Sequence, residues 1–424
     1  MARDIADADR QVPARQAGAL RKAAEFSHRH NLLGLAYILC LAATFLVHRP
    51  SAQSFVFFYL VLPLAALGLL SPARRKMSNS LVLWACALYL AALALSAFMQ
   101  PETDSWWAPG QAWRLSRHAA ITFLFVLVTA SLVAAYEKFL PRLLLFGGAL
   151  LALSALINIY LYYSALHPGL QLNELRLKAT IGMPGYENST NISATYAVFL
   201  VGALAMALRA GLPPLPGWQR ILAAGVAAVL LVAVLLTQSR NALLAVLASV
   251  NEAPTVAPPM PASWSLGALA LAAAIVAVSV PELRYFLFAR NSYRPEIWWN
   301  AIDYITNRPL FGWGSYFPVN FRYGPGTGSI VHQAHNLFLS AWFRGGVGAA
   351  FALAAIFFTG IYWAARYWTA ERRAAPLCMI VAVASLGVFD YQLLVHNNAS
   401  WEMVTFWLPF GVCAGAEMHM RRRR

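Results

Sequence analysis

The chain has 424 residues, of which 60% carry hydrophobic side chains and 12% are charged, and its formal net charge is +15. One soluble core could not bury that much apolar surface, so the composition excludes a soluble and a disordered protein. A β-barrel is also excluded, because the long apolar runs are apolar on every face and lack two-residue alternation. The sequence therefore predicts an all-α polytopic membrane protein.

The first 30 residues are charged and lack a small-residue cleavage site, which predicts a cytoplasmic extension followed by an uncleaved anchor. From residue 31 on, apolar runs of about 17 to 25 residues are long enough to cross a roughly 30 Å hydrocarbon layer and predict about twelve transmembrane helices. The predicted spans are 31–48, 54–71, 81–99, 119–136, 143–166, 192–208, 221–237, 241–251, 264–280, 336–361, 375–390 and 402–417. The eighth runs into a proline-rich stretch, which predicts a ragged or partly re-entrant inner end.

Lysine and arginine residues predict how these helices are oriented. With the N-terminus inside, 20 of the 32 basic residues fall in cytoplasmic segments, as the positive-inside rule requires. In a soluble chain this excess of basic residues would suggest a nucleic-acid partner. Here their distribution is explained by membrane orientation instead. Both termini are therefore predicted to be cytoplasmic, and two smaller outer loops join the large one on the periplasmic face. The predicted segments are the extension 1–30, spans 1–9 at 31–280, the large periplasmic loop 281–335, spans 10–12 at 336–417, the basic tail 418–424, and the smaller loops 100–118 and 167–191.

The large loop contains a segment with helical periodicity. Its apolar face comprises Ile297, Trp298, Ala301, Ile302 and Ile305, and its polar face comprises Asn300, Asp303 and Asn307. Two placements fit this pattern, one on the bilayer surface and one packed against the transmembrane helices. After the helix, Pro309 and the Gly312–Gly314 triplet predict a turn, and residues 324–328 predict a flexible stretch.

Five basic residues of the outer loops are candidates for binding an anion. A charged residue near membrane depth costs about 2.5 to 3.5 kcal/mol on insertion scales, so its presence requires a structural or functional explanation. Arg240 lies in a tight break between two apolar runs, and with Arg290 and Arg294 it would form a cationic patch suited to a diphosphate. Arg176 and Lys178 form a further candidate in the preceding loop. Arg240 could instead reach a lipid phosphate or cap helix carbonyls, and Arg290 and Arg294 could anchor a lipid headgroup. For Arg176 and Lys178 the alternative is an ordinary solvated loop.

Two histidines, His332 and His335, stand three residues apart where the large loop re-enters the membrane. Imidazole is the natural proton acceptor at neutral pH, so one of them is a candidate general base. A structural histidine is the main alternative. A zinc site has less support, because a catalytic zinc usually needs a third protein ligand and no HExxH pattern supplies one.

The outer face also lacks the motifs of several enzyme classes. It has no Asp-x-Asp pair for a metal-dependent nucleotide-sugar transferase, no Gly-x-Ser-x-Gly elbow for a serine hydrolase and no Walker loop for an ATPase. Arginines can neutralise a departing diphosphate without a metal. The combination that remains is a diphosphate-binding arginine set with one histidine base at the outer membrane surface.

Three motifs follow one another in the chain. The first is Thr237–Leu243 (TQSRNAL), the second joins Arg294–Trp298 (RPEIW) with Arg308–Gly314 (RPLFGWG), and the third joins His335–Leu339 (HNLFL) with Gly345–Gly348 (GGVG). Their order within a twelve-span frame with one long outer loop resembles the O-antigen ligase and polymerase superfamily of bacterial inner membranes.

The resemblance implies a GT-C-like, metal-independent, inverting glycosyltransferase that uses a lipid-linked donor and no cofactor. His335 takes the place of the family's proposed catalytic histidine. Arg240 and Arg294 take the places of arginines thought to hold the donor diphosphate, and Arg290 and Arg176 are further candidates for that role.

The function expected from this resemblance is O-antigen ligation at the periplasmic face of the inner membrane. The donor would be a glycan on undecaprenyl diphosphate and the acceptor the lipid A-core oligosaccharide. An O-antigen polymerase, with a second lipid-linked repeat as acceptor, is the alternative, because the motifs hardly separate the two. A transporter of lipid-linked sugars fits less well, because the charged residues gather at the outer surface rather than near the midplane.

Overall fold

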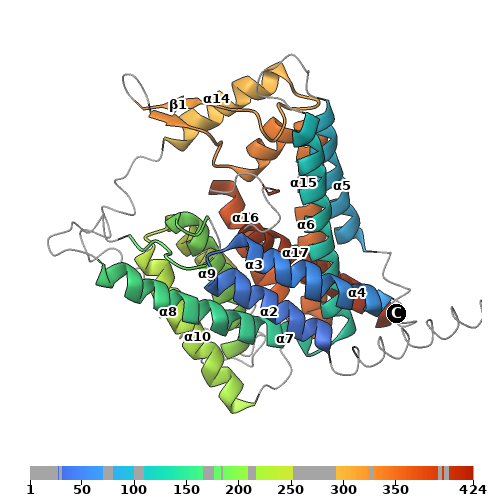
Figure 1. Cartoon of the computed structure of the whole chain (residues 1–424), viewed down its shortest axis with the longest axis vertical. Coiled ribbons are helices and arrows are strands. Elements are labelled where there is room, and N and C mark those ends of the chain that lie inside the picture. The colour runs from blue at the N-terminus through green and yellow to red at the C-terminus, as the bar shows by residue number, and fades with distance from the viewer. Residues whose placement is uncertain are drawn as a thin grey trace, which may run out of the picture.

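The computed structural model describes residues 27, 31–69, 80–99, 109–165, 176–182, 185–208, 216–251, 293–324, 329–389, 394–395 and 401–423. These parts of the chain are mostly α-helical and include one two-stranded sheet (Figure 1). The predicted span at 264–280 and Arg290 lie outside the described residues, as does the predicted N-terminal extension apart from Ser27.

The helices lie on the apolar runs that the sequence predicts. Before the large loop they are α2 (Leu32–Leu46), α3 (Pro50–Val56), the π-helical turn η1 (Phe57–Val61), α4 (Leu62–Leu69), α5 (Leu81–Phe98), α6 (Pro109–Ala135), α7 (Phe139–Arg142), the π-helical turn η3 (Leu143–Gly147), α8 (Gly148–Ser164), α9 (Ser189–Ala207), α10 (Gly217–Leu236) and α11 (Arg240–Asn251). After them come α14 (Arg294–Asn307), β1 (Phe321–Tyr323), β2 (Ser329–Val331), α15 (Leu337–Glu371), α16 (Ala375–Phe389), the π-helical turn η5 (Met403–Trp407) and α17 (Leu408–Arg423).

Within the described ranges, six helical segments have the length and apolar composition needed to cross a membrane. They are Leu81–Phe98, Gly110–Ala135, Phe139–Ser164, Ser189–Ala207, Gly217–Leu236 and Leu337–Glu371. Shorter apolar helices accompany them at Leu32–Leu46, Ser51–Leu67, Arg240–Ser249 and Ala375–Val388. The helical character of the chain is thus confirmed, whereas the total of twelve spans stays a prediction.

Side-chain caps explain where several of these helices begin. Asn31, Ser80, Asn188 and Asn336 each accept a hydrogen bond from a backbone N–H in the first turn of the helix that follows. Such caps satisfy donors that have no partner within the helix. Three of the four caps stand within one residue of a span boundary that hydropathy alone predicts.

Two groups of helices pack on either side of α16. In one group α5 contacts α6, α15 and α17; in the other α9 contacts α8, α10 and α11. Helix α16 contacts α15 and α17 of the first group and α9 and α11 of the second. Figure 1 shows the first group on the right and α8 and α10 on the left. Helix α9 is buried on nearly all of its faces, so the second group is built around it.

Ion pairs and capping bonds mark one end of the bundle, which we call the C-terminal end. One guanidinium nitrogen of Arg423 lies 2.8 Å from a carboxylate oxygen of Glu137, and the other lies 2.9 Å from a carboxylate oxygen of Glu371. The buried carboxylate of Glu417 accepts hydrogen bonds from the Ser80 hydroxyl and from the N–H of Val82. At the opposite end, which we call the α14 end, the other termini of α5 and α15 meet the segment that follows α14.

The structure differs from the prediction at α6 and at α15. The predicted loop 100–118 is wrong in its second half, because α6 begins at Pro109 and carries Arg114 and Arg117 on an exposed face while Leu115 is buried. The two arginines lower the hydropathy of these first turns of α6, so the sequence pattern resembles that of a loop. Helix α15 continues to Glu371, ten residues beyond the predicted span, and contains a non-helical residue at Gly346.

The periodic segment of the large loop forms α14, as predicted. Its buried residues Ile297, Ala301 and Ile305 pack with Phe321 of β1 and Phe343 of α15 in a small hydrophobic cluster. Helix α14 therefore packs on the protein, as in the second of the two placements. The stretch around residues 324–328 joins β1 and β2, which pair antiparallel. Strands of three residues gave no sequence pattern long enough to predict them.

Candidate functional site

The second and third sequence motifs meet at the α14 end of the bundle. The N–H of Trp313 donates to the carbonyl of Phe343 at 2.7 Å, and the N–H of Val347 donates to the carbonyl of Pro309 at 2.8 Å. Gly312 and Gly346 face each other with left-handed φ angles of 67° and 72°. A side chain on either residue would meet the backbone of the other segment, which explains why both motifs need glycine.

Replacing Gly346 with alanine should destabilise this junction. The new Cβ would overlap the carbonyl of Leu310, and alanine at a positive φ adds strain, so we expect a loss of about 2 to 5 kcal/mol. Gly348→Ala is the matched control, because a Cβ there has nothing within 4 Å. Thermal unfolding in detergent should show a lower Tm for Gly346→Ala alone. Equal Tm values for the two variants would contradict the close backbone contact.

Arg344, which has no sequence motif to mark it, holds the same loop from the side of α15. Its Nη1 donates to the carbonyl of Phe317 at 2.6 Å and to the carbonyl of Gly314 at 3.3 Å. Its guanidinium carbon also lies 4.9 Å from the ring centre of Phe343. The arginine therefore fixes the chain around Tyr316 relative to the start of α15.

His335 stands directly before the cap of α15. It is half-buried and has a left-handed φ of 48°, which is uncommon for a residue other than glycine. The next residue, Asn336, accepts from the N–H of Leu339 and donates to the carbonyl of Val388, at the end of α16. Such backbone strain is often found at functional sites. His332 is exposed, and its Nδ1 lies 2.8 Å from the carbonyl of Val319.

The structure brings Arg176 to the turn that carries Arg240. Arg176 donates from Nε to the carbonyl of Thr237 at 2.8 Å and from Nη2 to the hydroxyl of Thr190 at 3.2 Å. The neighbouring N–H of Leu177 donates to the carbonyl of Leu236 at 2.9 Å. Arg240, three residues after Thr237, is half-buried and is the first residue of α11. The loop of Arg176 is thus hydrogen-bonded to the turn that precedes Arg240. The two candidate arginines therefore stand on adjoining backbone segments.

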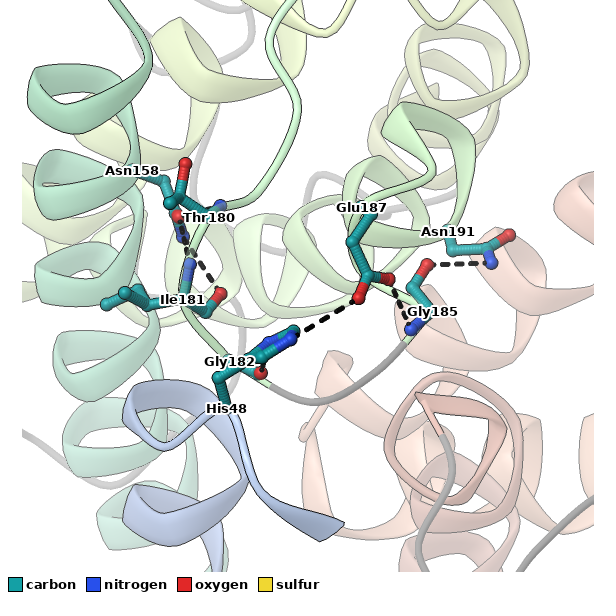
Figure 2. A network of polar contacts seen from close by, with 8 residues as sticks. All are labelled: His48, Asn158, Thr180, Ile181, Gly182, Gly185, Glu187 and Asn191. Atoms are coloured by element: carbon teal, nitrogen blue, oxygen red, sulfur yellow. Dashed lines mark hydrogen bonds and ion pairs between the residues drawn. The ribbon is translucent and has the colours of Figure 1, made fainter. Parts of the chain in front are cut away.

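A polar network holds the loop that carries Arg176 (Figure 2). The fully buried Asn158 of α8 accepts from the N–H of Thr180 at 2.6 Å and from the N–H of Ile181 at 2.8 Å. His48 contacts the carbonyl of Gly182 at 2.9 Å through Nδ1 and lies 3.6 Å from Glu187 through Nε2. The His48 pair is half-exposed and adds little energy, so Asn158 is the main anchor.

Replacing Asn158 with alanine should therefore loosen this loop. Two backbone N–H groups would lose their acceptor, and we expect a loss of about 2 to 4 kcal/mol. Amide hydrogen exchange should become faster at Thr180 and Ile181. Asn307→Ala is the control, because that asparagine is exposed and donates to a carbonyl of its own helix. If Thr180 and Ile181 kept their slow exchange, Asn158 would not be the anchor of the loop.

The described candidates lie on elements that pack on α16 or on its neighbours α11 and α15. Asn336, beside His335, contacts the end of α16, and α16 packs on α11, which begins at Arg240. Arg294 is the first residue of α14, which packs on α15 and β1. Lys178 is exposed on the loop of Arg176.

Comparison with known families matches a segment of the chain that contains several of these candidates. Residues 225–354 match a family model described as O-antigen ligase, and the matched segment contains Arg240, Arg294 and His335. A search of curated proteins finds no match. The apolar helices and this family together indicate a multi-pass membrane protein. The match, whose segment holds all three sequence motifs, supports membership of the chain in the O-antigen ligase family.

Proposed function

We propose that this protein is an O-antigen ligase of the bacterial inner membrane. It transfers a glycan from undecaprenyl diphosphate to a sugar hydroxyl of the lipid A-core oligosaccharide, with its α14 end facing the periplasm and both termini in the cytoplasm. The observation that carries the proposal is the family match over residues 225–354, which contains the cationic and histidine motifs.

In the proposed mechanism His335 acts as the general base. It takes the proton of the acceptor hydroxyl while that oxygen attacks the anomeric carbon of the donor in line. The bond between the anomeric carbon and the phosphate oxygen breaks, and the diphosphate leaves with the electron pair. The configuration at the anomeric carbon is therefore inverted.

The arginines stabilise the leaving group in this mechanism. Arg240 and Arg294 bind the diphosphate, with Arg290 and Arg176 as further ligands, and guanidinium groups can contact phosphate oxygens in a bidentate manner. The charge that develops on the departing diphosphate is neutralised by these side chains, so the reaction needs neither a metal nor a cofactor. The hydrogen bond that ties Arg176 to Thr237 supports a shared role with Arg240.

A reconstituted assay with purified components tests the function. The protein in detergent is mixed with lipid A-core and a donor that carries a single lipid-linked repeat. A ligase gives lipid A-core that carries one repeat, whereas a polymerase gives only longer lipid-linked chains. A protein that only transports lipid-linked sugars gives no new glycosidic bond, because detergent leaves no sealed compartment.

A further inference from the structure

Helix α6 presents one continuous exposed face at the α14 end. The exposed positions are Trp113, Arg114, Arg117, Ala120 and Leu124, and helical spacing places them along one side of the helix. The first three lie in the turns that the sequence predicted as loop. Below them the face is apolar and continues into the segment that is long enough to cross a membrane. The two arginines therefore stand above a lipid-facing strip.

The two arginines have no carboxylate partner in the described parts of the chain. Their charges act on Tyr316. Burial raises the pKa of this tyrosine, and the positive charges of Arg114 and Arg117 oppose that rise. Tyr316 belongs to the loop that Arg344 fastens to α15. The cationic pair thus borders the segment that leads to His335.

Aromatic side chains lie beside the pair. Trp113 makes an edge-to-face contact with Phe98 of α5, with ring centres 5.4 Å apart, and both rings are exposed, Trp113 by 68% and Phe98 by 44%. Tryptophan is enriched at the boundary between lipid tails and headgroups. This position is where the phosphate groups of a lipid would meet the guanidinium groups.

We propose that Arg114 and Arg117 bind the phosphate groups of the acceptor lipid, whose acyl chains lie along the face of Ala120 and Leu124. The inference rests on the proposed function. Helix α6 packs with α5 and α17, whereas Arg240 begins α11, which packs with α9 and α16. An in-line displacement brings the acceptor from the side opposite the leaving group, so separate cationic sites for the two lipids fit the reaction.

A binding measurement without donor tests the site. Full-length protein is titrated with diphosphorylated lipid A and with enzymatically dephosphorylated lipid A, and binding is followed by native mass spectrometry. Wild type should prefer the phosphorylated form by about tenfold or more, and the double variant Arg114→Gln/Arg117→Gln should lose that preference. Arg142→Gln is the matched control, because this exposed arginine follows α6 at the C-terminal end.

Transfer kinetics provide the second readout. The double variant should raise the KM for phosphorylated acceptor about tenfold or more and leave the KM for donor unchanged. With dephosphorylated acceptor, wild type and variant should have the same KM. The Tm should not change, because both side chains are exposed and their removal leaves no buried group without a partner.

Two results would overturn the inference. If phosphatidylglycerol vesicles compete as well as phosphorylated lipid A for the wild type, the pair is a general headgroup anchor. If the double variant keeps both the binding preference and the acceptor KM, the phosphates bind elsewhere. Binding of phosphorylated lipid A by a wild type that forms no glycan product would instead contradict only the proposed ligase function.

Discussion

Replacing His335 with alanine should lower the rate of glycan transfer by about 10²- to 10⁴-fold, the usual contribution of a positioned general base. The imidazole belongs to a residue with a strained backbone that directly precedes the cap of α15, so its location is set by the fold rather than by a free loop. Single-turnover transfer with saturating donor and acceptor measures the chemical step directly. Donor affinity should change little, because the diphosphate is held by other side chains.

His332→Ala provides the control for that experiment. This histidine lies three residues earlier, is exposed and contacts a backbone carbonyl, so its loss should change the rate by less than about twofold. Far-UV circular dichroism and Tm should match the wild type for both variants. Wild-type transfer by His335→Ala would assign the base to another group.

The helices could be predicted from sequence because a lipid environment leaves the backbone few choices. Every N–H and C=O within the hydrocarbon must be bonded inside the chain, so a long apolar run becomes a helix. The same reasoning failed at the start of α6. There Arg114 and Arg117 are tolerated because they occupy one exposed face, while Ala112 and Leu115 on the opposite face are buried.

The contacts that assemble the site could not be read from spacing. Arg176 and Thr237 are 61 residues apart, and nothing local to either shows that they share a hydrogen bond. The two glycine clusters did signal a close backbone contact, since Gly312 and Gly346 each stand at a position that has no room for a side chain. Asn158 gave another, because a buried amide within an apolar run needs partners, and those partners are the backbone of the loop that carries Arg176.

Replacing Arg240 with glutamine should cost about 2.7 to 4 kcal/mol of transition-state stabilisation, which is about 10²- to 10³-fold in kcat, by analogy with the loss of an oxyanion donor. Arg240→Lys should recover only part of the rate, because an ammonium group cannot make the bidentate contact of a guanidinium. Transfer rates at saturating donor measure the effect. They separate stabilisation of the leaving diphosphate from binding of the ground-state donor.

Arg322→Gln is the control for the arginine experiment, because Arg322 is exposed on β1 and lies in the same family-matched segment. Its loss should leave kcat within about twofold of wild type. If Arg240→Gln raised only the donor KM and kept kcat, Arg240 would bind the donor equally in ground and transition states. Because the Arg176 guanidinium bonds to Thr237 in the turn before α11, Arg176→Gln should lower kcat in the same direction as Arg240→Gln, and the two losses should be less than additive.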